Sequence, residues 1–202
     1  NWSNIIIASI NSSILATIIS VLVVIISTLT LYLFKTNSHI ISMWTNALYS
    51  TPGVVLAIAA ILIVNETSTL LLPVLFLYVM VMKYLAMGVD SIGVSIQKID
   101  RQYYYSAKTI GKDSEWYIFN VQIPMAMKGY LIAGILIWID VIRELIIGLT
   151  IRPQWLDLLS VEIFRFMDLE MLYMSGPWIL AMVMITFIPI YWIHVVMKDK
   201  FI

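Results

Sequence analysis

Long uninterrupted apolar runs are the feature that most constrains the fold of this chain. A helix needs about 20 apolar residues to cross the roughly 30 Å hydrocarbon core of a bilayer. Open strands would leave backbone groups unpaired in lipid, so each run is expected to be helical. The sequence therefore predicts an all-α, polytopic transmembrane helical bundle that forms a single domain over residues 1–202. The expected spans lie near residues 5–34, 43–64, 70–87, 125–150 and 177–197.

The composition agrees with a membrane protein and argues against several other classes. Hydrophobic residues make up 61% of the chain and charged residues 12%, whereas soluble domains average about 45–50% and about 25%. The net charge is zero, so no basic surface for nucleic acid is expected. Cysteine is absent, which excludes disulfides and thiolate metal sites. The sequence contains no H-E-x-x-H, G-x-S-x-G or P-loop motif. We therefore expect no enzyme, and active transport would need a partner that supplies energy.

The placement of Lys and Arg predicts the orientation of the bundle, because cytoplasmic loops carry an excess of these residues. If residues 35–42 are cytoplasmic, residues 88–124 and the tail after Met197 lie on the same side. Only Arg152 and Arg165 then lie in outer loops. We therefore expect the N-terminus outside and the C-terminus in the cytoplasm. The cations at or inside the inner boundary would be Lys35, Lys83, Lys98, Arg101, Lys108, Lys112, Lys128, Lys198 and Lys200.

Residues 155–174 form an outer segment with a pattern of its own. Its apolar residues recur at helical spacing among charged ones. This pattern predicts an amphipathic helix that packs on the outer face of the membrane or on the bundle. The apolar positions are Leu156, Leu159, Ile163, Phe166 and Met167.

The fourth span contains charged residues in the stretch "WIDVIRELIIG". Asp140, Arg143 and Glu144 are three and four residues apart, so they would share one helix face. Charges at membrane depth are costly and usually face protein or a water-filled path. Two interpretations stay open: a self-neutralising cluster that holds neighbouring helices, or residues along a substrate path.

The second span contains the proline-glycine pair of "YSTPGVVLAIAAIL", which is Pro52 and Gly53. Proline removes a helical hydrogen bond and bends a helix. A simple kink or a helix start is the favoured interpretation. The alternative is a broken helix beside a cavity, where irregular backbone is tolerated at membrane depth.

Residues 88–124 are expected to form a polar loop with a helix–glycine–helix unit. Its first part, "SIGVSIQKI", has isoleucines at helical spacing and is expected to continue the helix of the third span. Gly111 suits the left-handed position that ends a helix. Asp113 or Ser114 can cap a following helix, and Pro124 would mark the entry to the fourth span. Aromatic side chains on such a projection suit docking into the groove of a partner. The alternative is a helix pair that lies on the inner leaflet.

This segment resembles the cytoplasmic EAA loop of the membrane subunits of bacterial ABC importers. The family pattern is E-A-A, followed by a glycine and then by an I/L-P pair. Tyr105 stands at the glutamate of that pattern, and Tyr104 stands where many relatives carry another acid. The resemblance implies a coupling helix that sits in a cleft of an ATPase subunit. The matching positions are Tyr104, Tyr105, Ser106, Ala107, Gly111, Val121, Ile123 and Pro124.

A second resemblance concerns "DVIRELIIGLTIRP", which is similar to the ferric-iron permease segment E-x-x-K-E-L-P-A-T-L-L-L-R-P. The stretches "YSTPGVVLAIAAIL" and "YLAMGVDSIGVSIQKID" also resemble segments of that subfamily. Ile146 replaces the proline of E-L-P. The matching positions are Asp140, Arg143, Glu144, Leu145, Leu149, Arg152 and Pro153.

These resemblances imply a multi-pass permease component in the bacterial inner membrane. It would translocate ferric iron delivered by an extracytoplasmic binding protein. ATP and Mg²⁺ would be bound by separate ATPase subunits, and this chain would be the C-terminal half of a fused permease that pairs with a second half. Pro52, Gly53, Asp140, Arg143, Glu144, Arg152 and Pro153 are the candidates for the translocation path.

The metal and the substrate class remain open at this point. Hard Fe³⁺ prefers oxygen ligands, which makes Asp140 and Glu144 the candidates for contact with iron. Other substrates, such as thiamine, a polyamine or an oxyanion, stay open within the same class. A membrane enzyme or assembly factor that uses the central loop for docking is the alternative from a different class.

Overall fold

The computed structural model of the chain describes residues 2–33, 38–64 and 71–198, with side chains over 2–33, 42–62 and 71–191. Within these ranges the chain is helical and contains no strand, as the apolar runs predict. The predicted orientation also relied on three lysines whose side chains lie outside these ranges, namely Lys35, Lys198 and Lys200. The elements are α1 (Trp2–Leu33), α2 (Ser38–Ser50), α3 (Gly53–Val64), α4 (Leu72–Gln97), α5 (Arg101–Thr109), α6 (Ser114–Tyr117), the π-helix η1 (Ile118–Gln122), α7 (Ile123–Arg143), α8 (Ile146–Ile151), α9 (Leu159–Asp168) and α10 (Leu172–Lys198).

Several of these helices are long and apolar enough to cross a membrane. Four qualify on their own within the described chain: Trp2–Leu33, Leu72–Gln97, Ser114–Arg143 and Leu172–Tyr191. The pair 42–50 and 53–62 would make a fifth if it acts as one span, although it is bent by 96°. The fold is therefore that expected of a multi-pass membrane protein.

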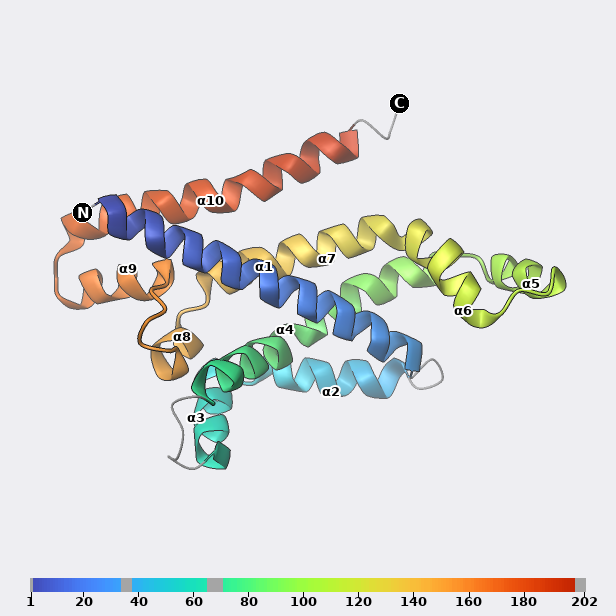
Figure 1. Cartoon of the computed structure of the whole chain (residues 1–202), viewed down its shortest axis with the longest axis horizontal. Coiled ribbons are helices and arrows are strands. Elements are labelled where there is room, and N and C mark those ends of the chain that lie inside the picture. Colours follow the sequence, from blue (N-terminus) through green and yellow to red (C-terminus); the bar gives the residue numbers. More distant parts are fainter. Residues whose placement is uncertain (1, 34–37, 65–70, 199–202) are drawn as a thin grey trace.

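The helices α1, α4 and α7 lie side by side and form the centre of the bundle (Figure 1). α2 runs along α4, and α10 packs against α1, α7 and α9. The N-terminal end of α1 lies at one end of the molecule, together with α8 and α9, whereas α5 and α6 project from the opposite end (Figure 1).

Small residues decide which face of α1 turns inward. This helix is apolar all round, so hydrophobicity alone does not select a face. Ala8, Ser12, Ala16 and Ser20 recur every four residues and are buried. Residues at this spacing lie above one another on a helix, and small side chains let neighbouring backbones approach closely.

Two glycines on other helices mark close approaches in the centre. A Cβ atom on Gly88 of α4 would overlap the Ser27 side chain of α1. A Cβ atom on Gly129 of α7 would overlap the Ser95 side chain of α4. The crossings of α1 with α4 and of α4 with α7 thus both depend on a missing side chain.

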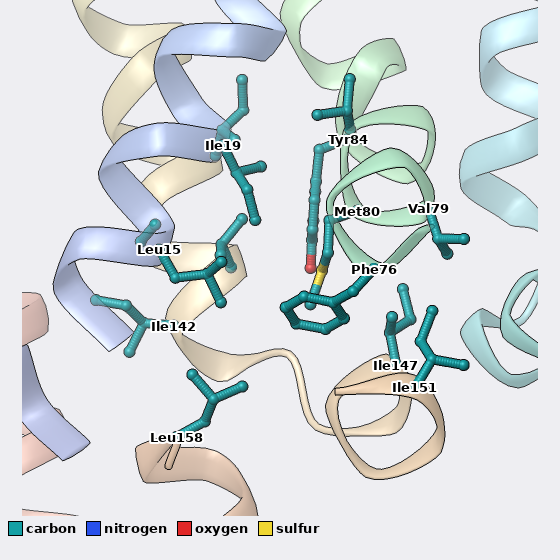
Figure 2. Close-up of a cluster of buried hydrophobic side chains, with 14 of the residues drawn as sticks. Leu15, Ile19, Phe76, Val79, Met80, Tyr84, Ile142, Ile147, Ile151 and Leu158 are labelled. Atoms are coloured by element: carbon teal, nitrogen blue, oxygen red, sulfur yellow. The ribbon is translucent and has the colours of Figure 1, made fainter. Parts of the chain in front are cut away.

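The main core fills the space between these helices near the end that carries α8. Figure 2 shows side chains from α1, α4, α7 and α8 converging, with Tyr84 and Met80 of α4 side by side. Lipid tails are as apolar as these side chains, so the gain here comes from close packing rather than from removal of water. The largest fully buried core residues include Ile19, Phe76, Met80, Ile137, Ile142, Ile147 and Ile151.

The central segment 88–124 is largely helical, as its spacing predicts. α4 continues past residue 87 to Gln97, because Val89 and Ile92 remain buried on its inner face. At the other end, residues 114–143 form one continuous helical stretch through η1. Pro124 lies in the first turn of α7, as expected, but α7 continues directly from η1 and α6. The π-helical turn lies directly before this proline, which cannot donate a helical hydrogen bond.

The fourth expected span, 125–150, is not one helix. α7 ends at Arg143, and Glu144 takes an extended conformation with φ −67° and ψ 114°. Residues 146–151 form the separate short helix α8. The bonds that Glu144 makes to residues outside α7 account for this break.

The outer segment 155–174 contains a helix over a shorter range, α9. Leu159 is fully buried and packs in one cluster with Ile5 of α1 and Trp178 of α10, joined by Ile163. The segment thus packs on the bundle. α9 ends before Glu170, whose φ is 56°, and residues from Leu172 onward already belong to α10.

Candidate functional site

A buried ion pair between two helices is the centre of the candidate site. Lys83 of α4 places its ammonium nitrogen Nζ 2.5 Å from Oε2 of Glu144, which directly follows α7. The two side chains are 16% and 8% exposed. A charge in an apolar interior is costly unless it is paired and hydrogen-bonded. Each of the two charges therefore permits the burial of the other.

Further hydrogen bonds hold Glu144 from three directions. The Tyr84 hydroxyl donates to Oε2 at 2.8 Å, and the backbone N–H of Ile147 donates to Oε1 at 3.3 Å. The hydroxyl of Ser160 donates to the backbone carbonyl of Glu144 at 2.8 Å. Glu144 therefore connects α4, α8 and α9 to the end of α7.

A second helix break lies against the same ion pair. α2 ends at Ser50 and α3 begins at Gly53, with the helix direction turned by 96°. Pro52 between them has no N–H and cannot continue the hydrogen-bond ladder. A Cβ atom on Gly53 would lie 3.2 Å from Nζ of Lys83 and 3.5 Å from Oε1 of Glu144. The start of α3 reaches the ion pair because residue 53 has no side chain.

The geometry at Pro52 and Gly53 confirms one half of the favoured interpretation and contradicts the other. A bend of 96° is too large for a simple kink. Gly53 does start a helix, but it does so after a break in an apolar stretch. Broken helices at membrane depth place their ends where polar groups can be satisfied. Here the polar group is the Lys83–Glu144 pair.

The three charged residues of "WIDVIRELIIG" do not act as one cluster. Arg143 pairs with Asp140 on the surface of α7, where its side chain is 60% exposed. Glu144 lies beyond the helix and pairs with Lys83. The interpretation as a self-neutralising cluster on one helix face is therefore wrong for Glu144.

Arg152 and Pro153 lie in the turn between α8 and α9. Nη1 of Arg152 donates to the carbonyl of Leu156 at 2.5 Å and lies 3.7 Å from Oδ1 of Asp157. Pro153 is buried in the same turn. These contacts hold the turn between α8 and α9. The same turn leads to Ser160, whose hydroxyl donates to the Glu144 carbonyl.

Acidic residues are spread rather than gathered in the part of the chain that the structure describes. No three His, Cys, Asp or Glu side chains lie together there as a ready-made metal site. Asp140 and Glu144, the candidates for contact with iron, are each bonded to a different cation.

The segment that resembles the coupling loop forms a compact unit of α5, Gly111 and α6. Asp100 caps α5, since its Oδ1 accepts from the N–H of Gln102 at 2.9 Å. Gly111 has φ 72°, the left-handed conformation that the sequence predicts. The N–H of Lys112 then donates back to the carbonyl of Ala107 at 3.0 Å. A glycine is favoured at this position because L side chains are strained in that conformation.

The α5–α6 unit has a small core of its own. Buried Ala107, Tyr117 and Ile118 form it, and part-buried Tyr104, Val121 and Ile123 pack against it. The rings of Tyr104 and Tyr117 meet edge to face at 5.3 Å between centroids. The side chains of the matched positions Tyr105, Ser106 and Pro124 are exposed.

Large apolar side chains of this unit point outward. Tyr105 is 61% exposed, Ile110 67% and Phe119 70%. Aromatic and aliphatic groups gathered on a small projection are typical of a surface that docks into a groove. This surface lies at the end of the molecule opposite to α8 and α9 (Figure 1).

The residue that sequence reasoning missed is Lys83. It was expected at the inner boundary of the membrane, but it lies near the middle of α4. A signal was present, since Lys83 is the one charged residue between Leu70 and Met87. A lone charge in an apolar span predicts a partner of opposite charge. Tyr84, the other donor to Glu144, gave no comparable signal.

In comparisons with known proteins, no protein-family model and no curated sequence matches this chain. The class of protein is therefore inferred from the fold and from the candidate site. It is an all-helical chain with several membrane-length helices, in which two helix breaks meet at a buried ion pair.

Proposed function

We propose that this chain is the membrane-spanning permease component of an ATP-driven ABC importer that translocates ferric iron. A binding protein outside the cytoplasm delivers the iron, and separate ATPase subunits hydrolyse ATP. The observation that carries this proposal is the α5–Gly111–α6 unit, which projects from one end of the bundle and exposes Tyr105, Ile110 and Phe119. Such a unit suits insertion into a groove of a partner subunit.

A continuous helix provides the connection between this unit and the candidate site. Residues Ser114–Arg143 form 30 residues of unbroken helical structure, which corresponds to about 45 Å at 1.5 Å per residue. A movement of α6 is therefore passed to Glu144 at the far end. Glu144 passes it on to α4 through Lys83, and to the start of α3 through the close approach of Gly53.

The ion pair supplies a two-state element for such a transport cycle. In the described state Lys83 and Tyr84 satisfy the Glu144 carboxylate. Separation of α4 from the end of α7 would break these bonds and expose a carboxylate and an ammonium to the path between the helices. Helix breaks that meet at polar groups are typical of substrate sites in transporters.

Ferric iron is proposed as the cargo because segment 140–153 resembles the corresponding segment of ferric-iron permeases. The carboxylates of Asp140 and Glu144 are oxygen ligands of the kind that Fe³⁺ prefers. Their pairing with Arg143 and Lys83 weakens any single binding site. Weak binding along a path suits transport, since a tightly held ion is not released.

The same proposal sets the orientation and the partners. The chain spans the bacterial inner membrane, with the N-terminus outside and α5, α6 and the C-terminus in the cytoplasm. It pairs with a second permease half and with ATPase subunits, and it receives substrate from the binding protein. This orientation places Lys98, Arg101, Lys108 and Lys112 on the cytoplasmic side, in agreement with the positive-inside rule.

The test is reconstitution of the chain in proteoliposomes with its second permease half, its ATPase and its binding protein. The proposal predicts uptake of Fe³⁺ that requires ATP and the binding protein. Vesicles that lack only the ATPase serve as the control. ATP-dependent uptake of thiamine, a polyamine or an oxyanion instead of Fe³⁺ would overturn the iron assignment. No ATP-dependent uptake of any of these would overturn the importer class.

A further inference from the structure

A cavity lies between the bundle and the α5–α6 unit. Its volume is about 660 Å³, within the range of about 300–1,000 Å³ that is usual for small-molecule sites. α1, α4 and α7 of the bundle line it, together with α5, α6 and η1. Tyr117 and Ile118 from the small core of the α5–α6 unit are among its lining residues.

The lining of this cavity contains polar side chains and one cation that suit an anion. It contains five tyrosines, two glutamines, one threonine and Arg101, and none of its lining residues carries a carboxylate. Among the described residues, no carboxylate lies within ion-pair distance of the Arg101 guanidinium. The nearby Asp100 is engaged at the start of α5, where it accepts from the N–H of Gln102. A planar guanidinium with free donors favours a phosphate group.

Another part of the lining is apolar and comes from membrane-length helices. Leu31 of α1 and Ile96 of α4 line it, and Gly93 leaves space between them because it has no side chain. A ligand that fits both parts of the lining has an anionic head and a hydrocarbon body. Tyrosine side chains are typical of the membrane interface, where such ligands are found.

We infer that this cavity binds one anionic phospholipid, with its phosphate on Arg101 and an acyl chain beside Leu31, Gly93 and Ile96. A free phosphate would satisfy Arg101 but would leave the apolar wall empty. A neutral lipid would fill that wall but would gain less from the cation. Basic pockets at the cytoplasmic ends of transmembrane helices bind anionic headgroups by the same chemistry.

The bound lipid would connect two parts that have separate cores. It would contact α1 and α4 on one side and the Arg101 end of α5 on the other. The inference concerns lipid binding alone, so it stands or falls independently of the proposed transport function.

The test is native mass spectrometry of the full chain in neutral detergent, with phosphatidylglycerol and phosphatidylcholine added in turn. We expect the chain to bind phosphatidylglycerol about fivefold or more tightly than phosphatidylcholine, which is the contribution of one interfacial cation. Arg101→Gln should remove that preference. Because Arg101 is exposed, this variant keeps the fold. Lys98→Gln is the matched control, since it removes the same charge nearby without lining the cavity, and it should keep the preference.

A second variant tests the apolar wall. Gly93→Leu places a side chain in the cavity and should weaken the binding of both lipids. An unchanged preference for phosphatidylglycerol in Arg101→Gln would overturn the inference. Displacement of phosphatidylglycerol by an equal concentration of soluble glycerol phosphate would overturn the assignment to a lipid, since it would show that the phosphate alone accounts for binding.

Discussion

Nζ of Lys83 and Oε2 of Glu144 are 61 residues apart in the sequence and 2.5 Å apart in the folded chain. Their pairing brings the middle of α4 to the end of α7, at the point where α3 begins. Two helix breaks that look unrelated in the sequence therefore share one polar contact.

The first prediction concerns the cost of leaving Glu144 without its cation. Lys83→Met should destabilise the chain by about 3 kcal/mol, because removal of one partner leaves an uncompensated buried charge. The double variant Lys83→Met/Glu144→Gln should cost less than Lys83→Met alone, since Gln keeps an acceptor for Tyr84 without the charge. Denaturant unfolding in detergent measures both.

The exposed Arg143–Asp140 pair supplies the control for this comparison. Arg143 is 60% exposed, so Arg143→Gln should cost no more than about 1 kcal/mol. If Lys83→Met were no more harmful than Arg143→Gln, the Lys83–Glu144 pair would not be the contact that stabilises this site.

The second prediction concerns the approach of α3 to the ion pair. Gly53→Ala places a methyl group 3.2 Å from Nζ of Lys83 and 3.2 Å from Cγ1 of Ile147. Because such crowding displaces neighbours, we expect a loss of about 1–3 kcal/mol of unfolding free energy and a further loss for Gly53→Val. Gly134→Ala is the control, since its nearest neighbour would lie 4.0 Å away. Equal effects of the two alanine variants would argue against a close approach at residue 53.

The third prediction concerns backbone conformation at Gly111. No atom lies within 4 Å of a Cβ built on this residue, so a substitution there acts through its φ of 72° alone. Gly111→Ala should cost about 1–2 kcal/mol, and Asn should be tolerated better. In reconstituted vesicles, Gly111→Val should lower uptake per ATP hydrolysed, because α5 no longer holds its angle to α6.

Gly176 provides the matched control, since its Cβ would also meet open space but its φ is not positive. Gly176→Ala should leave both stability and coupling near the wild-type values. A Gly111→Val variant that couples normally would show that the left-handed turn is not part of the coupling element.

The fourth prediction concerns the crossing of α4 and α7. Gly129→Ala would bring its Cβ atom into the Ser95 side chain, and overpacking of this kind costs about 1–3 kcal/mol. Ser95→Gly removes the obstructing group, so Gly129→Ala/Ser95→Gly should recover most of the lost stability. Thermal unfolding of the two single variants and the double variant measures this recovery. Additive losses would mean that the two residues do not oppose each other at the crossing.

The sequence alone predicted the parts of this molecule that depend on local pattern. Apolar runs predicted an all-helical chain with several membrane-length helices, and the glycine at position 111 predicted a left-handed turn. Both follow from properties of neighbouring residues. The break at Glu144 was not predicted, because its cause is a contact with Lys83 across 61 residues of sequence.

One helix boundary was wrong for the same reason. The helical spacing of residues 88–97 predicted that the helix of the third span continues through them, and it does so with Ile92 packed in the interior of the fold. The stretch 125–150 looks like one span by its apolar content, yet Glu144 ends α7 by bonding to α4 and α8. Hydropathy describes the residues of one segment alone, whereas the end of α7 is set by contacts that Glu144 makes with neighbouring helices.

The central claim is that α5 and the turn after it dock on an ATPase subunit, and cross-linking tests it most directly. The chain contains no cysteine, so Ser106→Cys creates a single exposed thiol on α5. A tagged chain would be purified from native membranes and treated with a thiol-to-amine cross-linker, with and without ATP. Glu170→Cys is the control, since it is exposed and lies just after α9, which is at the end of the molecule opposite to α5 (Figure 1). The account predicts a cross-link from Ser106→Cys to an ATPase subunit whose yield changes with ATP, and none from Glu170→Cys. Equal cross-linking at both positions, or none to an ATPase at position 106, would contradict it.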